Sequence, residues 1–303
     1  MTETVQSAID ARLDALSIPS RIDTDSYPSI VALFEEALST YRDEAACSSV
    51  GHTLTYADLD RLSAQFAGWL QHGAGLEQGD RVAVQMPNLI QYLVVCLGAL
   101  RAGMVVVNTN PLYTERELEH QLSDAGVKVM VVQANVAQTA AAVLPETGVQ
   151  TVVVTEIADL HPQPKRALIN FLVKYVKRMV PAFSIPGALK LNAVLKAGAK
   201  TPYRAVILNR DELAMLQYTG GTTGVAKGAM LTHGNLIANV LQSDAFFETH
   251  NIDGRGSTML QPLPVYHIYA FTASMYALRI GAHTAFVPNP RDLPSVVKAF
   301  ADC

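Results

Sequence analysis

A short stretch in the last third of the chain concentrates residue types that hold phosphate groups. From Thr219 to Gly228 the sequence reads TGGTTGVAKG, and eight of these ten residues are Gly, Thr or Lys. Glycines let backbone N–H groups approach a phosphate closely, threonine hydroxyls add donors, and lysine adds a positive charge. Charge-assisted hydrogen bonds contribute roughly 1.5–3 kcal/mol each, so a few can hold a polyphosphate. We predict a phosphate-binding loop with these ligands: Thr219, Gly220, Gly221, Thr222, Thr223, Gly224 and Lys227.

This loop follows neither of two common phosphate-binding patterns. A Walker A loop ends in Gly-Lys followed by Ser or Thr, whereas Lys227 precedes Gly228 and Ala229, and no GxGxxG occurs in the chain. The plain alternative is a flexible hairpin turn. A turn needs one or two glycines and does not need four with three threonines and a lysine, so we favour phosphate binding.

A second candidate segment, Pro262 to Phe271 (PLPVYHIYAF), places one histidine among aromatic residues. Its two prolines keep the backbone extended, so that the rings can form one wall of a cleft. Tyr266 and His267 are the candidate site residues. A lone histidine among aromatics is more often a buried core residue whose hydrogen bonds are satisfied, and on the residues alone that interpretation stands beside the first.

The elements that must position these residues alternate between short, Val-rich strands and helices. We expect strands at 81–85, 104–107, 127–132 and 149–155, and helices at 89–101, 114–125 and 136–144. This alternation predicts a parallel sheet with helices on both faces. The predicted divisions are a lead-in and first helix at 1–44, a first α/β subdomain at 45–160, a basic insertion at 161–207 and a second, incomplete α/β subdomain at 208–303.

Composition narrows the class of protein. The chain has 303 residues, of which 50% are hydrophobic and 17% charged, which excludes a disordered, collagen-like or coiled-coil protein. Three cysteines and no CxxC argue against a disulfide scaffold or a structural zinc site and favour a reducing cytosol. The longest apolar run, Leu93 to Leu100, is too short to span a membrane, and the polar N-terminus does not have the pattern of a secretory signal.

Charge is distributed unevenly along the chain. Residues 160–210 contain ten Lys or Arg and no Asp or Glu, although the whole chain has a net charge of −4. Within this block, 165–180 is predicted to be a helix with a polar stripe that includes Arg166, Lys174, Lys177 and Arg178. Two interpretations have equal weight: docking on an anionic membrane through this stripe, or a helix that covers the sheet and leaves a basic edge in solvent. Nucleic acid is a weaker candidate, because phosphate binding does not require so much apolar surface.

Several of these segments resemble motifs of a known enzyme family. Leu216–Lys227 matches the AMP-binding motif of the adenylate-forming enzymes, which include acyl-CoA synthetases, luciferases and peptide-synthetase adenylation domains. Pro262–Phe271 resembles the aromatic-histidine motif of the family, 79–83 and 108–113 resemble segments of its first subdomain, and 232–236 is interpreted as a helix cap. The similarity runs from about Tyr27 to the end of the chain. Bacterial long-chain fatty acid–CoA ligases are the most similar branch.

The resemblance implies an α/β fold of two stacked βα subdomains, with the second truncated and the C-terminal domain absent. It implies ATP, Mg²⁺ and coenzyme A as cofactor and substrates, with a fatty acid activated to acyl-AMP and then joined to the thiol. His267 would lie near the acyl carboxylate and α-phosphate, with Tyr266 in the substrate site and Lys227 on the departing phosphates. The magnesium ligands, the ribose-binding Asp and the catalytic lysine of the family are not found in this chain, so we expect little activity from it alone.

Two alternatives to this function stay open. A ligase of the same family could act on another carboxylic acid, or the chain could be a non-catalytic half that binds nucleotide or lipid. The expected location is the cytoplasm, with peripheral contact to the inner face of the membrane as part of the docking hypothesis.

Overall fold

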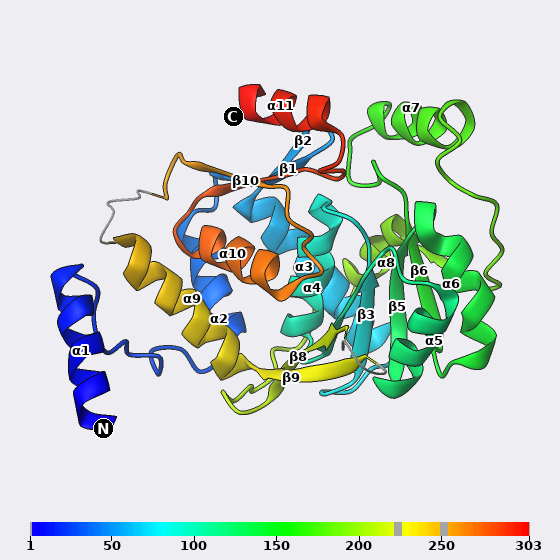
Figure 1. Cartoon of the computed structure of the whole chain (residues 1–303). Helices are drawn as coiled ribbons and strands as arrows, with labels where there is room; N and C mark the ends of the chain where they lie inside the picture. The colour runs from blue at the N-terminus through cyan, green and yellow to red at the C-terminus, as the bar shows by residue number, and fades with distance from the viewer. Residues whose placement is uncertain (1, 221–225, 249–253, 303) are drawn as a thin grey trace.

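A computed structural model describes residues 2–220, 226–248 and 254–302 and contains two β-sheets (Figure 1). The larger sheet has seven strands, and all neighbouring pairs are parallel except β8 and β9. Its central strands are Val-rich and buried, as expected for a parallel sheet with both faces covered. In spatial order the strands are β7 (Leu189–Lys190), β6 (Thr151–Thr155), β5 (Val127–Gln133), β3 (Arg81–Gln85), β4 (Val105–Thr109), β8 (Leu213–Thr219) and β9 (Lys227–Thr232).

The smaller sheet has four strands, of which only β1 and β2 pair in antiparallel fashion. Its spatial order is β10 (Thr258–Gln261), β11 (His283–Phe286), β1 (Ala45–Ser49) and β2 (His52–Thr55). Both sheets thus join strands that are distant in sequence, since β4 pairs with β8 and β1 pairs with β11.

The α/β class predicted from the alternation is confirmed, and strand β3 has the predicted bounds. Sheet membership, however, crosses the residue ranges predicted for the two subdomains. Strands β8 and β9 come from 208–303 and complete the larger sheet, whereas β1 and β2 come from 45–160 and complete the smaller one. Short buried strands carry no mark of which neighbour they pair with, so the order along the chain did not reveal this.

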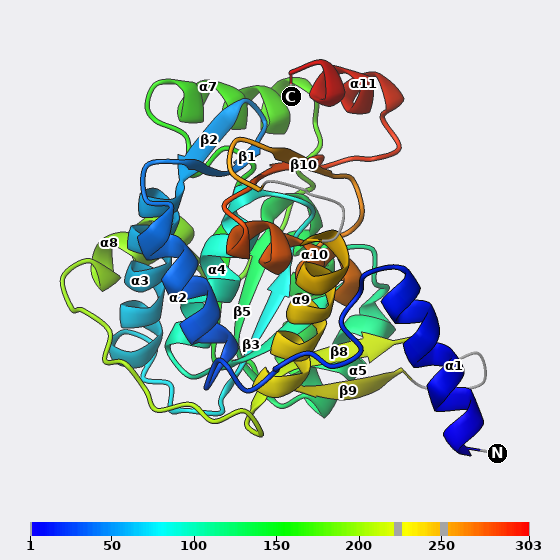
Figure 2. The same cartoon turned by 90° about the vertical axis from the view of Figure 1, so that its left-hand side faces the viewer.

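Helices cover both faces of the larger sheet (Figure 2). On one face α5 and α6 pack against the sheet around the smaller hydrophobic cluster. The other face contributes to the main core, together with the helices packed around α4. The helices are α2 (Ile30–Thr40), α3 (Tyr56–His72), α4 (Ile90–Arg101), α5 (Glu115–Asp124), α6 (Ala137–Val143), α8 (Leu191–Gly198), α9 (His233–Glu248) and α10 (Ile268–Arg279), with 3₁₀ turns at Ala134–Val136 and Leu144–Glu146.

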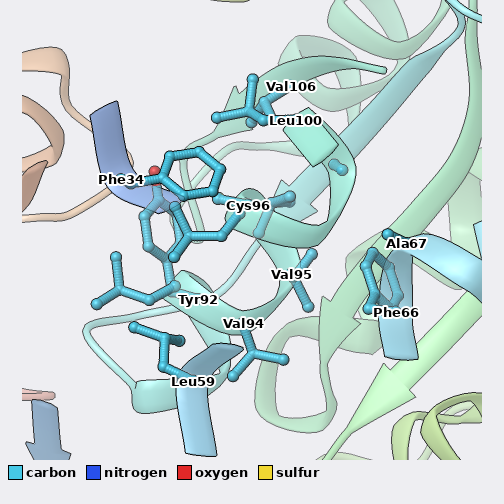
Figure 3. Packing of buried hydrophobic residues seen from close by; sticks show 14 of the residues in the cluster. Phe34, Leu59, Phe66, Ala67, Tyr92, Val94, Val95, Cys96, Leu100 and Val106 are labelled. Carbon is cyan, nitrogen blue, oxygen red and sulfur yellow. The ribbon is translucent and has the colours of Figure 1, made fainter. Parts of the chain in front are cut away.

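Helix α4 lies at the centre of the main core, and all of its residues are buried. Figure 3 shows Tyr92 and Cys96 of this helix beside Phe34 of α2, with Leu59 and Phe66 of α3 nearby. Its one charged residue, Arg101, is 4% exposed; it donates to the Asp60 carboxylate at 2.6 Å and forms an ion pair with Glu35. These contacts fix α4 to α2 and α3.

Three helices lie at the periphery in both cartoon views. Helix α1 (Thr2–Ala15) stands apart from the body, in keeping with the lead-in predicted for 1–44. Helices α7 (Lys165–Phe171) and α11 (Leu293–Asp302) lie at the opposite end, and α7 continues into a π-helical turn, Leu172–Val176.

Candidate active site

The predicted phosphate loop lies at the tip of the antiparallel hairpin that β8 and β9 form. Thr219 pairs with Lys227, and Tyr218 pairs with Gly228, so the two ends of the loop lie side by side. Thr219, Gly220 and Lys227 are all exposed. The other predicted ligands, Gly221, Thr222, Thr223 and Gly224, lie outside the described residues.

Helix α5 holds both arms of this hairpin. The Tyr218 hydroxyl donates to Asp124 Oδ2 at 2.5 Å, and His120 Nε2 lies 2.9 Å from the carbonyl oxygen of Ala226. Burial, followed by the neighbouring Asp124 carboxylate, raises the pKa of Tyr218, so the phenol keeps the proton that it donates. A Cβ on Gly228 would lie 3.0 Å from the Tyr218 ring, so a larger residue there would require the ring to shift. The base of the loop is therefore fixed to the body of the protein.

A buried polar network lies below the hairpin, around Asn108 at the carboxyl end of β4. The Tyr92 hydroxyl donates to Asn108 Oδ1 at 2.7 Å, and Asn108 Nδ2 donates to Gln217 Oε1 at 3.2 Å. The Gln121 amide donates to the Asn108 carbonyl at 2.9 Å. Four elements are tied together at this point. Residues 108–113 were predicted only as a segment similar to the first subdomain of the family, and the signal that could have found Asn108 is the change to polar residues at the end of a Val-rich strand.

Asn88, which follows β3, forms hydrogen bonds with the backbone at the start of the aromatic-histidine motif. Its amide donates to the carbonyls of Gln261 at 3.0 Å and Leu263 at 2.8 Å, and its oxygen accepts from the Val265 N–H at 2.9 Å. These three hydrogen bonds of the side chain go to one stretch of backbone. Asn88 was not among the predicted residues, because a single polar residue after a strand carries little signal.

His267 is exposed at the start of α10. Its Nδ1 accepts a hydrogen bond from the Tyr269 N–H at 3.3 Å, so the neutral ring carries its proton on Nε2. That N–H can donate to an anionic oxygen outside the helix. The alternative interpretation of His267 as a buried core residue is wrong, because the ring is used as a helix cap and not as packing.

Tyr113 interacts electrostatically with residues of both motifs. Burial raises its pKa, with further contributions from Glu117 and from the phenol of Tyr266. Tyr113 also contributes to raising the pKa of Tyr218 beneath the hairpin. The Tyr113 phenol therefore acts electrostatically on Tyr218 in the β8–β9 hairpin and on Tyr266 in the aromatic-histidine segment.

A cavity of about 260 Å³ lies where the strands of both sheets end. It is lined by residues that follow β3, β4, β10 and β11, among them Asn88, Leu112, Tyr266 and Arg291. Burial raises the pKa of Tyr266, and the Arg291 charge opposes that shift. Crevices at the carboxyl ends of parallel strands are the usual ligand sites of α/β folds. Arg291 is a further candidate that sequence analysis missed.

A second cavity of about 350 Å³ lies between α9, β10 and α10. Its walls are mainly apolar and include Phe247, Met259, Tyr269, Tyr276 and Ile280. Tyr269 in its wall is two residues beyond His267 in the chain. The cavity suits an alkyl or aryl group, and the crevice beside Tyr266 adds the polar groups of Asn88 and Arg291 to walls that are rich in proline.

The comparisons with known proteins agree with this geometry. A family model described as AMP-binding enzyme matches residues 34–302. The chain belongs to the AMP-binding enzymes. Among curated relatives, a long-chain-fatty-acid–CoA ligase of Escherichia coli O157:H7 is 45% identical over 94% of this chain, and one of Bacillus subtilis is 33% identical over 86%.

Solved structures of the family confirm the fold. A long-chain-fatty-acid–CoA ligase from Archaeoglobus fulgidus matches 86% of this chain and 47% of its own, with a TM-score of 0.69 and 23% identity. An anthranilate–CoA ligase in complex with anthranoyl-AMP matches 93% of this chain and 50% of its own, with a TM-score of 0.75 and 17% identity. The chain spans about half the length of the curated relatives it matches, 51% for the Escherichia coli protein and 46% for that of Bacillus subtilis.

The remaining predicted residues of this AMP-binding enzyme lie elsewhere. Arg166, Lys174, Lys177 and Arg178 belong to the end of the molecule where α7 lies, away from the β8–β9 hairpin (Figures 1 and 2). Thr232 and Asn235 exchange side-chain-to-backbone hydrogen bonds at the start of α9, which confirms the cap interpreted at 232–236. Within the described ranges no three His, Cys, Asp or Glu side chains gather to hold a metal ion.

Proposed function

We propose that this chain forms the ATP- and acyl-binding half of a long-chain fatty acid–CoA ligase. The proposal rests on the Gly- and Thr-rich connection between β8 and β9, the exposed Nε2 donor of His267, and the apolar cavity whose wall includes Tyr269, two residues after that histidine. The identity of 44–45% to bacterial long-chain ligases supports the choice of a fatty acid over other acids.

The proposed chemistry has two steps. The fatty acid carboxylate attacks the α-phosphorus of ATP, so that acyl-AMP forms and pyrophosphate leaves. The thiolate of coenzyme A then attacks the acyl carbonyl carbon, which forms the thioester and expels AMP. Both steps gain mainly from positioning and from neutralisation of charge, and neither requires covalent participation by the protein.

Each predicted residue has a place in this scheme. Lys227 and the backbone and hydroxyl groups of 219–224 bind the departing phosphates. His267 donates its Nε2–H to the acyl carboxylate or the α-phosphate, and Tyr266 borders the crevice that also contains Asn88 and Arg291. The alkyl chain occupies the cavity lined by Tyr269 and Tyr276.

ATP brings Mg²⁺, which neutralises phosphate charge when bound. No three His, Cys, Asp or Glu side chains gather among the described residues, and we assign no residue of this chain to the metal. Coenzyme A is the second substrate of the proposed reaction, and we assign no residue of this chain to it.

Two other functions are compatible with the same frame. A different carboxylic acid could occupy the apolar cavity, or the chain could bind nucleotide or lipid without turnover. We also infer that the 303-residue chain alone has little or no ligase activity, because it spans half the length of the relatives.

Titration of the chain with a fluorescent ATP analogue tests the nucleotide site. We expect Lys227→Ala to weaken binding about 10- to 100-fold, which corresponds to the loss of one charge-assisted hydrogen bond. The matched control is Lys200→Ala, at an exposed lysine remote from the hairpin, which should bind as the parent chain does. Equal binding by both variants would contradict the assignment of Lys227.

ATP–pyrophosphate exchange with palmitate, octanoate and benzoate then separates the alternatives. Nucleotide binding without exchange on any acid agrees with our inference about this chain and leaves the non-catalytic function open, which a chain of the relatives' full length decides. Exchange that palmitate supports above the Lys227→Ala background would disprove the inference of inactivity. A preference for benzoate would replace the fatty acid by an aryl acid.

We further propose that the protein works in the cytoplasm and touches the inner face of the membrane. Among the described residues, no helix is both long enough and apolar enough to cross a bilayer.

A further inference from the structure

The helical segment 165–179, formed by α7 and the turns that follow it, turns its apolar side chains away from the protein. Of these residues only Val173 is buried, at 7% exposure. Six large apolar residues are between 39% and 62% exposed: Leu168, Phe171, Leu172, Tyr175, Val176 and Met179. The rings of Phe171 and Tyr175 lie 5.1 Å apart and form a paired aromatic surface.

The same segment is attached to the protein through a polar side chain. Asn170 donates to Glu156 and Asp159, each at 3.2 Å, and accepts a hydrogen bond from the Ala158 N–H at 3.0 Å. The positive charge of Arg166 also acts on Asp159 and helps to counter the effect of burial, which raises the pKa of that carboxyl group. An amphipathic helix that covers a sheet would place its apolar face inward. Segment 165–179 does the reverse, so the structure does not support the cover-helix interpretation.

The predicted basic stripe is therefore divided in two. Arg166 is half-buried and Asn170 faces the protein, whereas Lys174, Lys177 and Arg178 are exposed beside the apolar residues. The Lys174 ammonium lies 5.4 Å from the centre of the Tyr175 ring. The exposed surface of the segment thus combines apolar bulk with three cations.

The excess of basic residues in and around this segment indicates that its binding partner is anionic. Residues 160–210 carry ten basic and no acidic residues, while the rest of the chain has 13 basic and 27 acidic residues. A second copy that packed on the same surface would bring like charges together. A surface that is apolar at its centre and cationic at its edge is complementary to a bilayer with anionic headgroups. Both cartoon views show α7 at one end of the molecule, where a plane can reach it (Figures 1 and 2).

We propose that segment 165–179 docks the protein on anionic membranes, with its exposed apolar side chains inserted at the headgroup boundary and Lys174, Lys177 and Arg178 on the phosphates. This is distinct from the ligase chemistry, because the hairpin and the cavities lie on other elements. Binding by this surface requires no nucleotide, acid or coenzyme A, so it can be tested whether or not the proposed function holds.

The test is sedimentation of the chain with vesicles of phosphatidylglycerol and phosphatidylethanolamine, compared with vesicles of phosphatidylcholine alone. We expect binding to the anionic vesicles, and a fall of at least about 25-fold in the partition coefficient for Lys174→Glu/Lys177→Glu, because each of the two cations removed contributes roughly fivefold. Phe171→Ser/Tyr175→Ser should reduce partitioning about tenfold or more, because two inserted rings are lost.

Matched controls keep the result specific. Arg12→Glu/Arg21→Glu changes the net charge by the same amount at exposed residues outside the segment, and Leu112→Ser/Met230→Ser removes two exposed apolar side chains elsewhere. Both controls should change partitioning less than about threefold. Circular dichroism of each variant establishes that it is folded.

Three outcomes would overturn the proposal. Equal binding to anionic and neutral vesicles would show association without charge recognition. Equal losses in the segment variants and their controls would show that segment 165–179 is not the contact. No vesicle binding, with a dimer in size-exclusion chromatography that Phe171→Ser/Tyr175→Ser dissociates, would show that a second copy covers this surface.

Discussion

Two apolar helices of this protein, α4 and segment 165–179, meet their surroundings in opposite ways. Helix α4 is buried along its whole length, and its one charged residue, Arg101, is paired within the core. Segment 165–179 holds the protein with Asn170 and leaves Phe171 and Tyr175 in solvent. The two helices show that apolar content alone does not determine which face of a helix is buried. The buried face also depends on where the hydrogen-bond and ion-pair partners of its polar residues lie, and these partners belong to other elements of the fold.

Leucine truncation gives the largest expected contrast. Leu97 in α4 is fully buried, so Leu97→Ala removes packing and leaves a cavity that should lower the free energy of unfolding by about 2–5 kcal/mol. Leu168 is 58% exposed, and Leu168→Ala should change the same free energy by less than about 0.5 kcal/mol. Urea denaturation measures both. Equal costs would show that segment 165–179 is packed in solution and would break the comparison.

Acidification gives a smaller contrast through a buried histidine of the core. Burial lowers the pKa of His233 to about 4, from the ordinary histidine value of 6.5. Between these values the unfolded chain binds more protons than the folded protein, so stability falls as pH drops from 6.5 towards 4. For this group the loss should be roughly 2 kcal/mol by pH 5.

Denaturation at pH 7 and pH 5 measures this loss, and His233→Gln should flatten the pH dependence. Partitioning onto phosphatidylglycerol vesicles should not weaken between these pH values, because His233 takes no part in it. A parallel fall in stability and in vesicle binding would mean that the two regions unfold together.

Loss of the polar attachment of segment 165–179 should have the smallest effect. Asn170→Leu removes the hydrogen bonds to Ala158, Glu156 and Asp159, and a net cost of about 1 kcal/mol is expected. Amide hydrogen exchange in 165–176 should become about fivefold faster, while the amides of α4 keep their rates. Acceleration in both helices would show that the attachment supports the core as well.

The sequence predicts those features of the fold and site that are encoded locally. The strand expected at 81–85 matches β3, and the helix expected at 114–125 matches α5 to within one residue at each end. The Gly- and Thr-rich stretch connects β8 to β9, and its phosphate-binding role stays a prediction. His267 is exposed at the start of α10, and its role in the site also stays a prediction.

The features that escaped prediction depend on partners far along the chain. The role of Asn88 depends on its hydrogen bonds to 261–265, which lies beside it only in the folded protein. The role of Asn108 likewise depends on the pairing of β8 with β4. Helical periodicity predicts a polar stripe and a wide apolar remainder in 165–180, but it cannot say which face meets the protein. The hydrogen bonds of Asn170 to Glu156 and Asp159, two residues that precede α7, determine which face meets the protein.

The pairing of β1 with β11 has a consequence for biosynthesis. Cys47 lies opposite Thr284, so strand β1 leaves the ribosome more than 230 residues before its parallel partner. At about 5–20 residues per second, the interval is on the order of ten to fifty seconds. During that time β1 can pair only with β2 and exposes an open backbone edge to other nascent chains. Slow translation between the two strands would lengthen this exposure and lower the yield of soluble protein.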